Sequence, residues 1–110
     1  MKHITFYTRC RDCTTGDLIK EVQGYTDGHF FYWRQRSTWH AVEPSTGLST
    51  CTGRTLKVTI ENASSPGNIN RVAAFLNRFG EESTKRFTDL LKNVGITEYN
   101  WQEIASNKKN

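Results

Sequence analysis

Residues 17–35, DLIKEVQGYTDGHFFYWRQ, decide the fold prediction for this chain. Residues 17–25 predict a strand, with Leu18, Lys20 and Val22 on one face and Ile19, Glu21 and Gln23 on the other. Asp27-Gly28 then supplies the positive φ that a tight hairpin turn needs. Residues 29–35 are rich in aromatic side chains and predict the returning strand. The stretch therefore predicts an antiparallel hairpin.

Further strand-like segments lie on both sides of this hairpin. Residues 2–8 predict a strand before it, with Ile4 and Phe6 on one face and Thr5 and Tyr7 on the other. Residues 38–43 and 48–52 predict two strands after it, separated by a turn at residues 44–47 that contains proline and glycine. Antiparallel strands joined by such short turns form a meander.

Residues 54–63 fit two descriptions. Leu56, Val58 and Ile60 alternate with polar residues, as in a strand. Thr55, in contrast, is a good cap for a helix over the same residues. The β-branched side chains favour the strand slightly.

Residues 66–107 have the three-and-four spacing of apolar side chains that is typical of helices. The Ser-Ser-Pro sequence at 64–66 predicts a helix start, because serine caps a helix and proline suits its first turn. Gly80 and Gly95 predict the ends of a first and a second helix. A third, short helix follows.

These patterns together predict a single α+β domain over residues 1–110. An antiparallel meander of four to five strands, within residues 2–60, is followed by two to three short helices within residues 66–107 that pack on the sheet. Residues 1–63 are thus expected to be β-rich. A chain of 110 residues has room for one modest core.

The composition is that of a folded protein. Its 6 Phe, 4 Tyr and 3 Trp can fill a core, whereas disordered chains lack aromatic residues. No apolar run approaches the roughly 18 residues of a membrane span or the core of a signal peptide. Three cysteines are an odd number and too few for a disulfide scaffold, so we expect a reducing, cytoplasmic compartment. The net charge of +4 permits an acidic partner without requiring one.

The aromatic and basic stretch 29–40, HFFYWRQRSTWH, is the main functional candidate. Only one face of a small sheet has to cover the core, so the other face is expected to present rings beside arginines. Nucleic-acid-binding sheets hold bases and phosphates with such side chains. The predicted contact residues are Tyr32, Arg34, Arg36, Trp39 and His40, with Arg9 and Arg11 nearby if the first hairpin lies alongside.

This chemistry predicts a small, non-enzymatic binding module. Its expected partner is nucleic acid or a nucleic-acid-handling protein complex. In general style the short chain is similar to the small single-domain proteins of phages and mobile elements, and an inhibitor of a host nuclease or defence system would fit it. Two other interpretations of the stretch stay open: rings buried on both faces, or the centre of a protein interface.

A zinc-ribbon-like structural domain is the first alternative. Cys10 and Cys13 form a CxxC pair, a spacing that lets two thiolates face one metal ion. Cys51 and either His40 or His3 would complete the four ligands. Because no second pair with ligand spacing follows, the prediction is a protein without a cofactor, with zinc as the alternative.

A minimal enzyme is the second alternative. His40 or Cys51 would then be the catalytic residue, as a general base or a nucleophile. The sequence has no glycine-rich phosphate loop, no nucleophile elbow and no metalloprotease helix motif. We therefore predict that the chain is not an enzyme.

Overall fold

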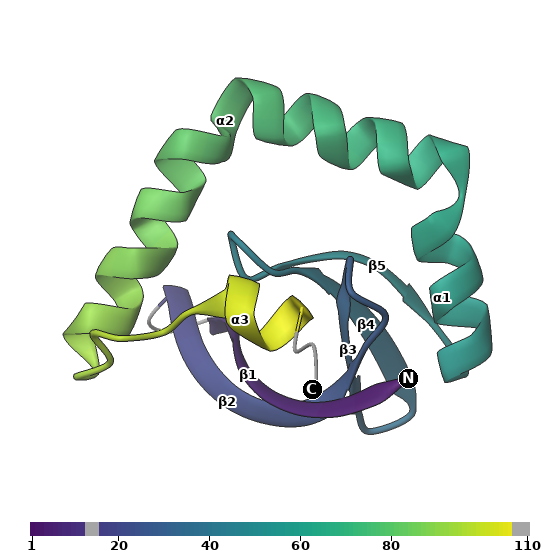
Figure 1. The fold of residues 1–110 in the computed structure, drawn as a ribbon, viewed down its shortest axis with the longest axis horizontal. Helices are drawn as coiled ribbons and strands as arrows, with labels where there is room; N and C mark the ends of the chain where they lie inside the picture. Colours follow the sequence, from purple (N-terminus) through teal and green to yellow (C-terminus); the bar gives the residue numbers. More distant parts are fainter. Residues whose placement is uncertain (13–15, 107–110) are drawn as a thin grey trace.

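The computed structural model describes residues 1–12 and 16–106, and of residues 11, 12 and 16 only the backbone. This part of the chain forms a five-stranded antiparallel sheet in the order β1-β2-β3-β4-β5, followed by helices that pack on it (Figure 1). The predicted α+β class and the meander order are confirmed. The elements are β1 (Lys2–Asp12), β2 (Gly16–Thr26), β3 (Phe31–Gln35), β4 (Thr38–Glu43), β5 (Leu48–Gly53), α1 (Leu56–Ser64), α2 (Pro66–Asn93) and α3 (Trp101–Ser106).

The sheet is strongly curled. β1 and β2 pair along their whole length, whereas β2 pairs with β3 only through its last two residues, so the β1–β2 hairpin curves away from the other strands (Figure 1). Gly24 permits the crossing, because a Cβ there would lie 1.8 Å from the carbonyl oxygen of Tyr32. At the far end of β1 the N–H of Arg9 donates to the carbonyl of Gly47 at 2.8 Å. The two outer strands therefore approach each other, and the sheet resembles a partly open barrel.

The inner face of the curled sheet holds the first hydrophobic core. α3 and the segment before it pack against this core and cover the outer edge of β1. There the N–H of Tyr7 donates to the hydroxyl of Tyr99 at 3.3 Å, and Lys2 Nζ donates to the carbonyl of Ile104 at 3.3 Å. The buried members of the first core are Ile4, Phe6, Val22, Phe31, Trp33 and Val42.

The opposite face of β3 and β4 holds the second core, which α1 and the first half of α2 cover. Its buried members are Phe30, Tyr32, Ala41 and Ala63. The slight preference for a strand over residues 54–63 is wrong, because residues 56–64 form α1. Thr55 caps this helix by accepting a hydrogen bond from the N–H of Val58 at 3.1 Å.

The geometry of α1 explains why the strand pattern failed. A strand would place Leu56, Val58 and Ile60 on one face. In the helix Leu56, Ile60 and Ala63 share a face and pack in the second core, while Val58 stays 40% exposed. The covering of the sheet, and not the local preference of β-branched residues, therefore decides the structure of this segment.

α2 is one long helix where two helices were predicted. Gly80 does not end it and does not adopt a positive φ. An interior glycine costs about 1 kcal/mol relative to alanine, whereas a break would leave several backbone groups unpaired. Gly95 does mark the end of α2: its φ is +85° and its N–H donates to the carbonyl of Lys92 at 2.9 Å. Figure 1 shows α2 arching over the sheet.

Helix side chains cap the outer edge of β5. Asn62 Nδ2 donates to the carbonyl of Thr52 at 3.0 Å, and Arg71 Nη2 donates to the carbonyl of Thr50 at 2.7 Å. Exposed carbonyls on an edge strand invite pairing with another chain, and these two are occupied. Among the residues that the structure describes, no helix is both long and apolar enough to cross a membrane.

Candidate nucleic-acid interface

The predicted contact residues separate onto two faces of the β3–β4 hairpin. Arg34 lies opposite Trp39, and His40 lies opposite Trp33. Side chains directly opposite each other in an antiparallel pair share a face, and neighbours along a strand alternate. Arg34 and Trp39 therefore belong to one face and His40 to the other.

Tyr32 is part of the second core and is fully buried. Its hydroxyl donates to Asp27 Oδ2 at 2.7 Å. Burial, together with this hydrogen bond, holds the pKa of Tyr32 well above its usual value. The expectation that this ring lies open for stacking is wrong, because α1 and α2 cover its face of the sheet.

Arg9 holds elements of the fold together. Its Nη2 pairs with Asp17 Oδ2 at 2.7 Å, and its Nη1 donates to Ser83 Oγ of α2 at 3.3 Å. The side chain is only 10% exposed, so it links β1, β2 and α2 and is not a surface cation. Arg11 lies on β1, and its side chain falls outside the described part of the structure.

His40 stacks on the first core. Its ring centre lies 5.3 Å from that of Trp33 at an interplanar angle of 21°, and its Nδ1 lies 3.2 Å from Ser49 Oγ. Lys20 Nζ lies 5.6 Å from the centre of the same Trp33 ring. Burial lowers the pKa of His40, since the charged imidazolium is poorly solvated there.

This lowered pKa predicts a loss of stability in mild acid. Below about pH 6.5, the ordinary histidine value, the unfolded chain gains a proton at residue 40 while the folded chain resists it. The free energy of unfolding should therefore fall as the pH drops through this range and level off below the folded pKa. Urea unfolding at a series of pH values should show a shallower pH dependence for His40→Gln than for the wild type. His29→Gln, at an exposed site, is the control; equal slopes for both variants would contradict the prediction.

The cysteines do not form a common site within the described residues. Cys10 packs against the first core and Cys51 against the second, on opposite faces of the sheet. Cys13 lies outside the described residues. In residues 1–12 and 16–106, no three side chains of His, Cys, Asp or Glu gather as metal ligands would.

Cys51 and His40 are not paired as a nucleophile and base. Cys51 lies opposite Ala41, the neighbour of His40 in β4, so the two side chains point to different faces. Burial also raises the pKa of the Cys51 thiol, which keeps it protonated.

Three rings form a row on the face that carries Trp39, and the Trp39 ring itself packs in part against the second core. The rings of His3 and Tyr25 have centres 5.3 Å apart and meet edge to face, and those of Tyr25 and Trp39 are 6.3 Å apart. The rings come from β1, β2 and β4. His3 is exposed and the other two are half-buried. We call His3, Tyr25 and Trp39 the ring row.

Four exposed cations lie on the elements that meet at Trp39. Arg34 and Gly53 are both opposite Trp39, and Arg54 follows Gly53 directly. The first turn of α1 has no acidic side chain to balance its positive end. None of the four has an ion-pair partner within the described ranges. We call Arg34, Arg36, Arg54 and Lys57 the basic rim.

The turn between β3 and β4 places an arginine where glycine would fit more easily. Arg36 has a φ of +58°, a value that L-residues other than Asn and Asp rarely adopt. Its backbone carbonyl accepts a hydrogen bond from Arg34 Nε at 2.7 Å, so the Arg34 side chain is held against the turn that carries Arg36. A residue kept in such a conformation is a reason to look for function at that position.

The sequence pointed to Arg34, Arg36 and Trp39 but missed His3 and Tyr25. These two lie opposite each other in the β1–β2 ladder, and only the crossing of that hairpin over β3 brings them to Trp39. The available signal was an isolated glycine inside a strand pattern, since such a glycine often marks a close approach of two backbones.

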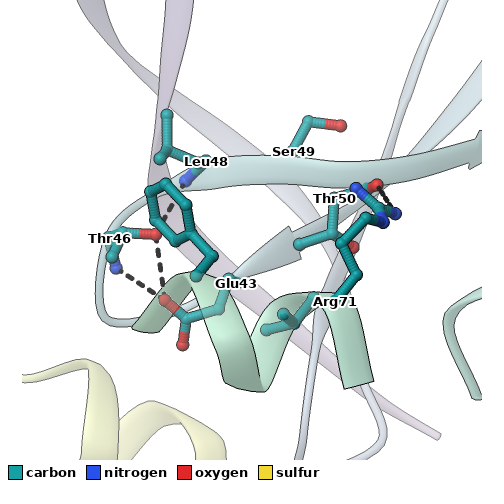
Figure 2. A pocket seen from close by; sticks show the side chains of 8 residues that line it. Glu43, Thr46, Leu48, Ser49, Thr50 and Arg71 are labelled. Atoms are coloured by element: carbon teal, nitrogen blue, oxygen red, sulfur yellow. Dashed lines mark hydrogen bonds between the residues drawn. The ribbon is translucent and has the colours of Figure 1, made fainter. Parts of the chain in front are cut away.

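A cavity of about 160 Å³ between α2 and β5 is a weaker candidate (Figure 2). The carboxylate of Glu43 accepts hydrogen bonds from the N–H and hydroxyl of Thr46 at 3.0 and 2.9 Å. Arg71 donates to the carbonyl of Thr50 on the other side of the cavity. Both charged side chains are thus engaged by the chain itself, which favours a structural role.

Comparisons with known proteins give no match to any family model, curated protein or solved structure. A function for this chain therefore has to be argued from its own geometry. The ring row and the basic rim are the features that carry such an argument.

Proposed function

We propose that this chain is a small binding module that holds single-stranded nucleic acid on the ring row and the basic rim. The observation that supports it is a row of three rings, from three strands, that ends at the basic rim, whose four cations have no ion-pair partner in the described part of the chain. Bases of any sequence stack on aromatic rings, and arginine and lysine bind the phosphates between them. The residues carried over from the sequence prediction are Arg34, Arg36 and Trp39.

The charges on the face that carries the ring row favour binding of an anion at its Trp39 end. The whole chain has a net charge of +4, and the basic rim gathers four cations at the Trp39 end. Farther along the β1–β2 ladder Tyr7 lies opposite the exposed Glu21, whose charge contributes to raising the pKa of Tyr7, although burial contributes most. An anionic strand is thus favoured near Trp39 and disfavoured near Glu21.

A binding module without catalytic activity acts by covering the surface of its partner that other molecules would contact. We propose that it covers single-stranded nucleic acid within a nucleic-acid-handling complex, as an inhibitor from a phage or mobile element would. A cytoplasmic location belongs to the same proposal, and the free thiols of Cys10 and Cys51 support it.

The test is fluorescence anisotropy with a mixed-sequence, single-stranded oligonucleotide at several salt concentrations. Three or four phosphate contacts should give a log–log salt slope of about −2 to −3, since each contact to a single strand contributes roughly 0.7. A duplex of the same length should bind more weakly, because its bases cannot reach the ring row. Failure to bind at low salt would overturn the nucleic-acid proposal and leave a protein interface, whose affinity depends less on salt.

Arg36→Gly should weaken oligonucleotide binding and leave the stability of the fold nearly unchanged. Glycine suits a φ of +58°, so the free energy of unfolding should change by less than about 1 kcal/mol. Losing one phosphate contact should reduce the salt slope by about 0.7 and weaken binding at low salt severalfold. Lys85→Gln on α2 removes the same charge away from the interface and should bind like the wild type. Equal binding by the wild type and Arg36→Gly would remove Arg36 from the site.

A further inference from the structure

One side of α2 carries a stripe with a cation at one end, two rings in the middle and a carboxylate at the other end. Arg71, Phe75, Phe79 and Glu82 follow one another at spacings of four, four and three residues, so they share one side of the helix. The two phenylalanines are 37% and 42% exposed, with ring centres 5.5 Å apart. Two large exposed rings side by side are typical of a contact surface. We call these four residues the α2 stripe.

The rest of the described chain covers this stripe only in part. Arg71 and Phe75 line the cavity between α2 and β5, where Arg71 donates to the carbonyl of Thr50, whereas Phe79 and Glu82 do not line it. α2 arches over the sheet (Figure 1). Val72 lines two cavities, of about 160 and 560 Å³. Arg78 stacks its guanidinium over the Phe79 ring at 5.3 Å, which shields that ring only in part. Within the described residues Glu82 has neither a hydrogen bond nor an ion pair.

We propose that two copies of this chain associate through the α2 stripe, with their α2 helices antiparallel. A two-fold axis between Phe75 and Phe79 places each Phe75 beside the Phe79 of the other copy. The same axis brings each Glu82 near the Arg71 of the other copy. Two antiparallel copies of the α2 stripe therefore match each cation with a carboxylate and each ring with a ring.

This charge order identifies the occupant as a second copy in one orientation. A parallel pair would place Arg71 against Arg71 and Glu82 against Glu82, which repel each other. The antiparallel pair joins opposite charges at both ends and covers all four rings between them. The ring row lies on β1, β2 and β4, so this inference does not depend on nucleic-acid binding.

Sedimentation equilibrium of the full chain over about a hundredfold concentration range tests the dimer. The wild type should shift from monomer to dimer, and Phe79→Ser or Glu82→Arg should weaken the association at least about tenfold. Asn77→Glu adds a charge to the same helix about half a turn away from the stripe, and it should associate like the wild type. A wild type that stays monomeric throughout, or variants that all associate equally, would overturn the proposal.

A charge swap tests the antiparallel pairing. Arg71→Glu combined with Glu82→Arg should restore most of the association that Glu82→Arg loses, because both ends again join opposite charges. Circular dichroism melting checks each variant, since Arg71 also donates to the carbonyl of Thr50. If the folded swap variant associates no better than Glu82→Arg, the antiparallel pairing is wrong. If the swap variant does not fold, Phe79→Ser and Glu82→Arg still decide, because neither touches that hydrogen bond.

Discussion

Gly24→Ala should leave little folded protein. The new Cβ would lie 1.8 Å from the carbonyl oxygen of Tyr32 and 2.9 Å from its carbonyl carbon. Both neighbours are backbone atoms, so no rotation of a side chain relieves the clash. The β1–β2 hairpin would have to lift away from β3, and the first core would lose the contact between Phe6 and Phe31, whose ring centres lie 4.9 Å apart. Overpacking in cores commonly costs about 1–3 kcal/mol, and a displaced hairpin exceeds that range.

Urea unfolding and near-ultraviolet circular dichroism measure this loss. A loss of several kcal/mol is a large part of the total stability of a small domain, which is about 5–15 kcal/mol. Gly67→Ala is the matched control, because no atom lies within 4 Å of a Cβ added there and its φ is not positive. The control should be as stable as the wild type, or more stable by about 0.4–1 kcal/mol. A Gly24→Ala variant that unfolds at the wild-type urea concentration would show that the crossing is looser than described.

Removing three charges of the basic rim should weaken oligonucleotide binding about a hundredfold at low salt. The variant is Arg34→Gln, Arg36→Gln and Arg54→Gln combined, at three exposed positions that do not belong to either core. Its log–log salt slope should be shallower by about 2, at roughly 0.7 for each lost phosphate contact. Anisotropy titrations at several salt concentrations measure both quantities.

A second triple variant tests whether binding depends on the position of the charges or only on their number. Lys85, Arg86 and Lys92, each changed to glutamine, remove the same net charge from exposed positions on α2. This variant should keep most of the wild-type affinity and its salt slope. Equal losses in the two triple variants would mean that nucleic acid responds to the overall charge of the protein and not to the basic rim.

The meander could be predicted because its signals are local. Asp27 and Gly28 lie in the connection between β2 and β3, with a φ of +94° at Gly28, although this connection spans residues 27–30 and β3 begins two residues later than predicted. Alternation along each strand marks its two faces. The structure of residues 56–64 could not be predicted, since it depends on which face meets the second core. Gly80 was misjudged for the same reason: a helix that packs at both ends tolerates a glycine in its middle.

The residues of the candidate interface also divide into those that the sequence could predict and those that it could not. Arg34, Arg36 and Trp39 belong to one hairpin, so the sequence alone could bring them together. His3 and Tyr25 join Trp39 only through the crossing at Gly24, which is a contact between segments far apart in the sequence. Whether a ring on β3 is open depends on where the helices pack, and no alternation pattern contains that information. The nucleic-acid partner itself stays a prediction.

The cover on the outer edge of β1 has a consequence for synthesis. Tyr99 and Ile104, which contact this edge, leave the ribosome after every strand of the sheet. Until then a nascent chain exposes an unpaired strand edge, the kind of surface through which growing chains on one polysome associate. The interval between the emergence of the strands and the release of α3 is therefore the stage at which we expect this protein to be most exposed to misassembly.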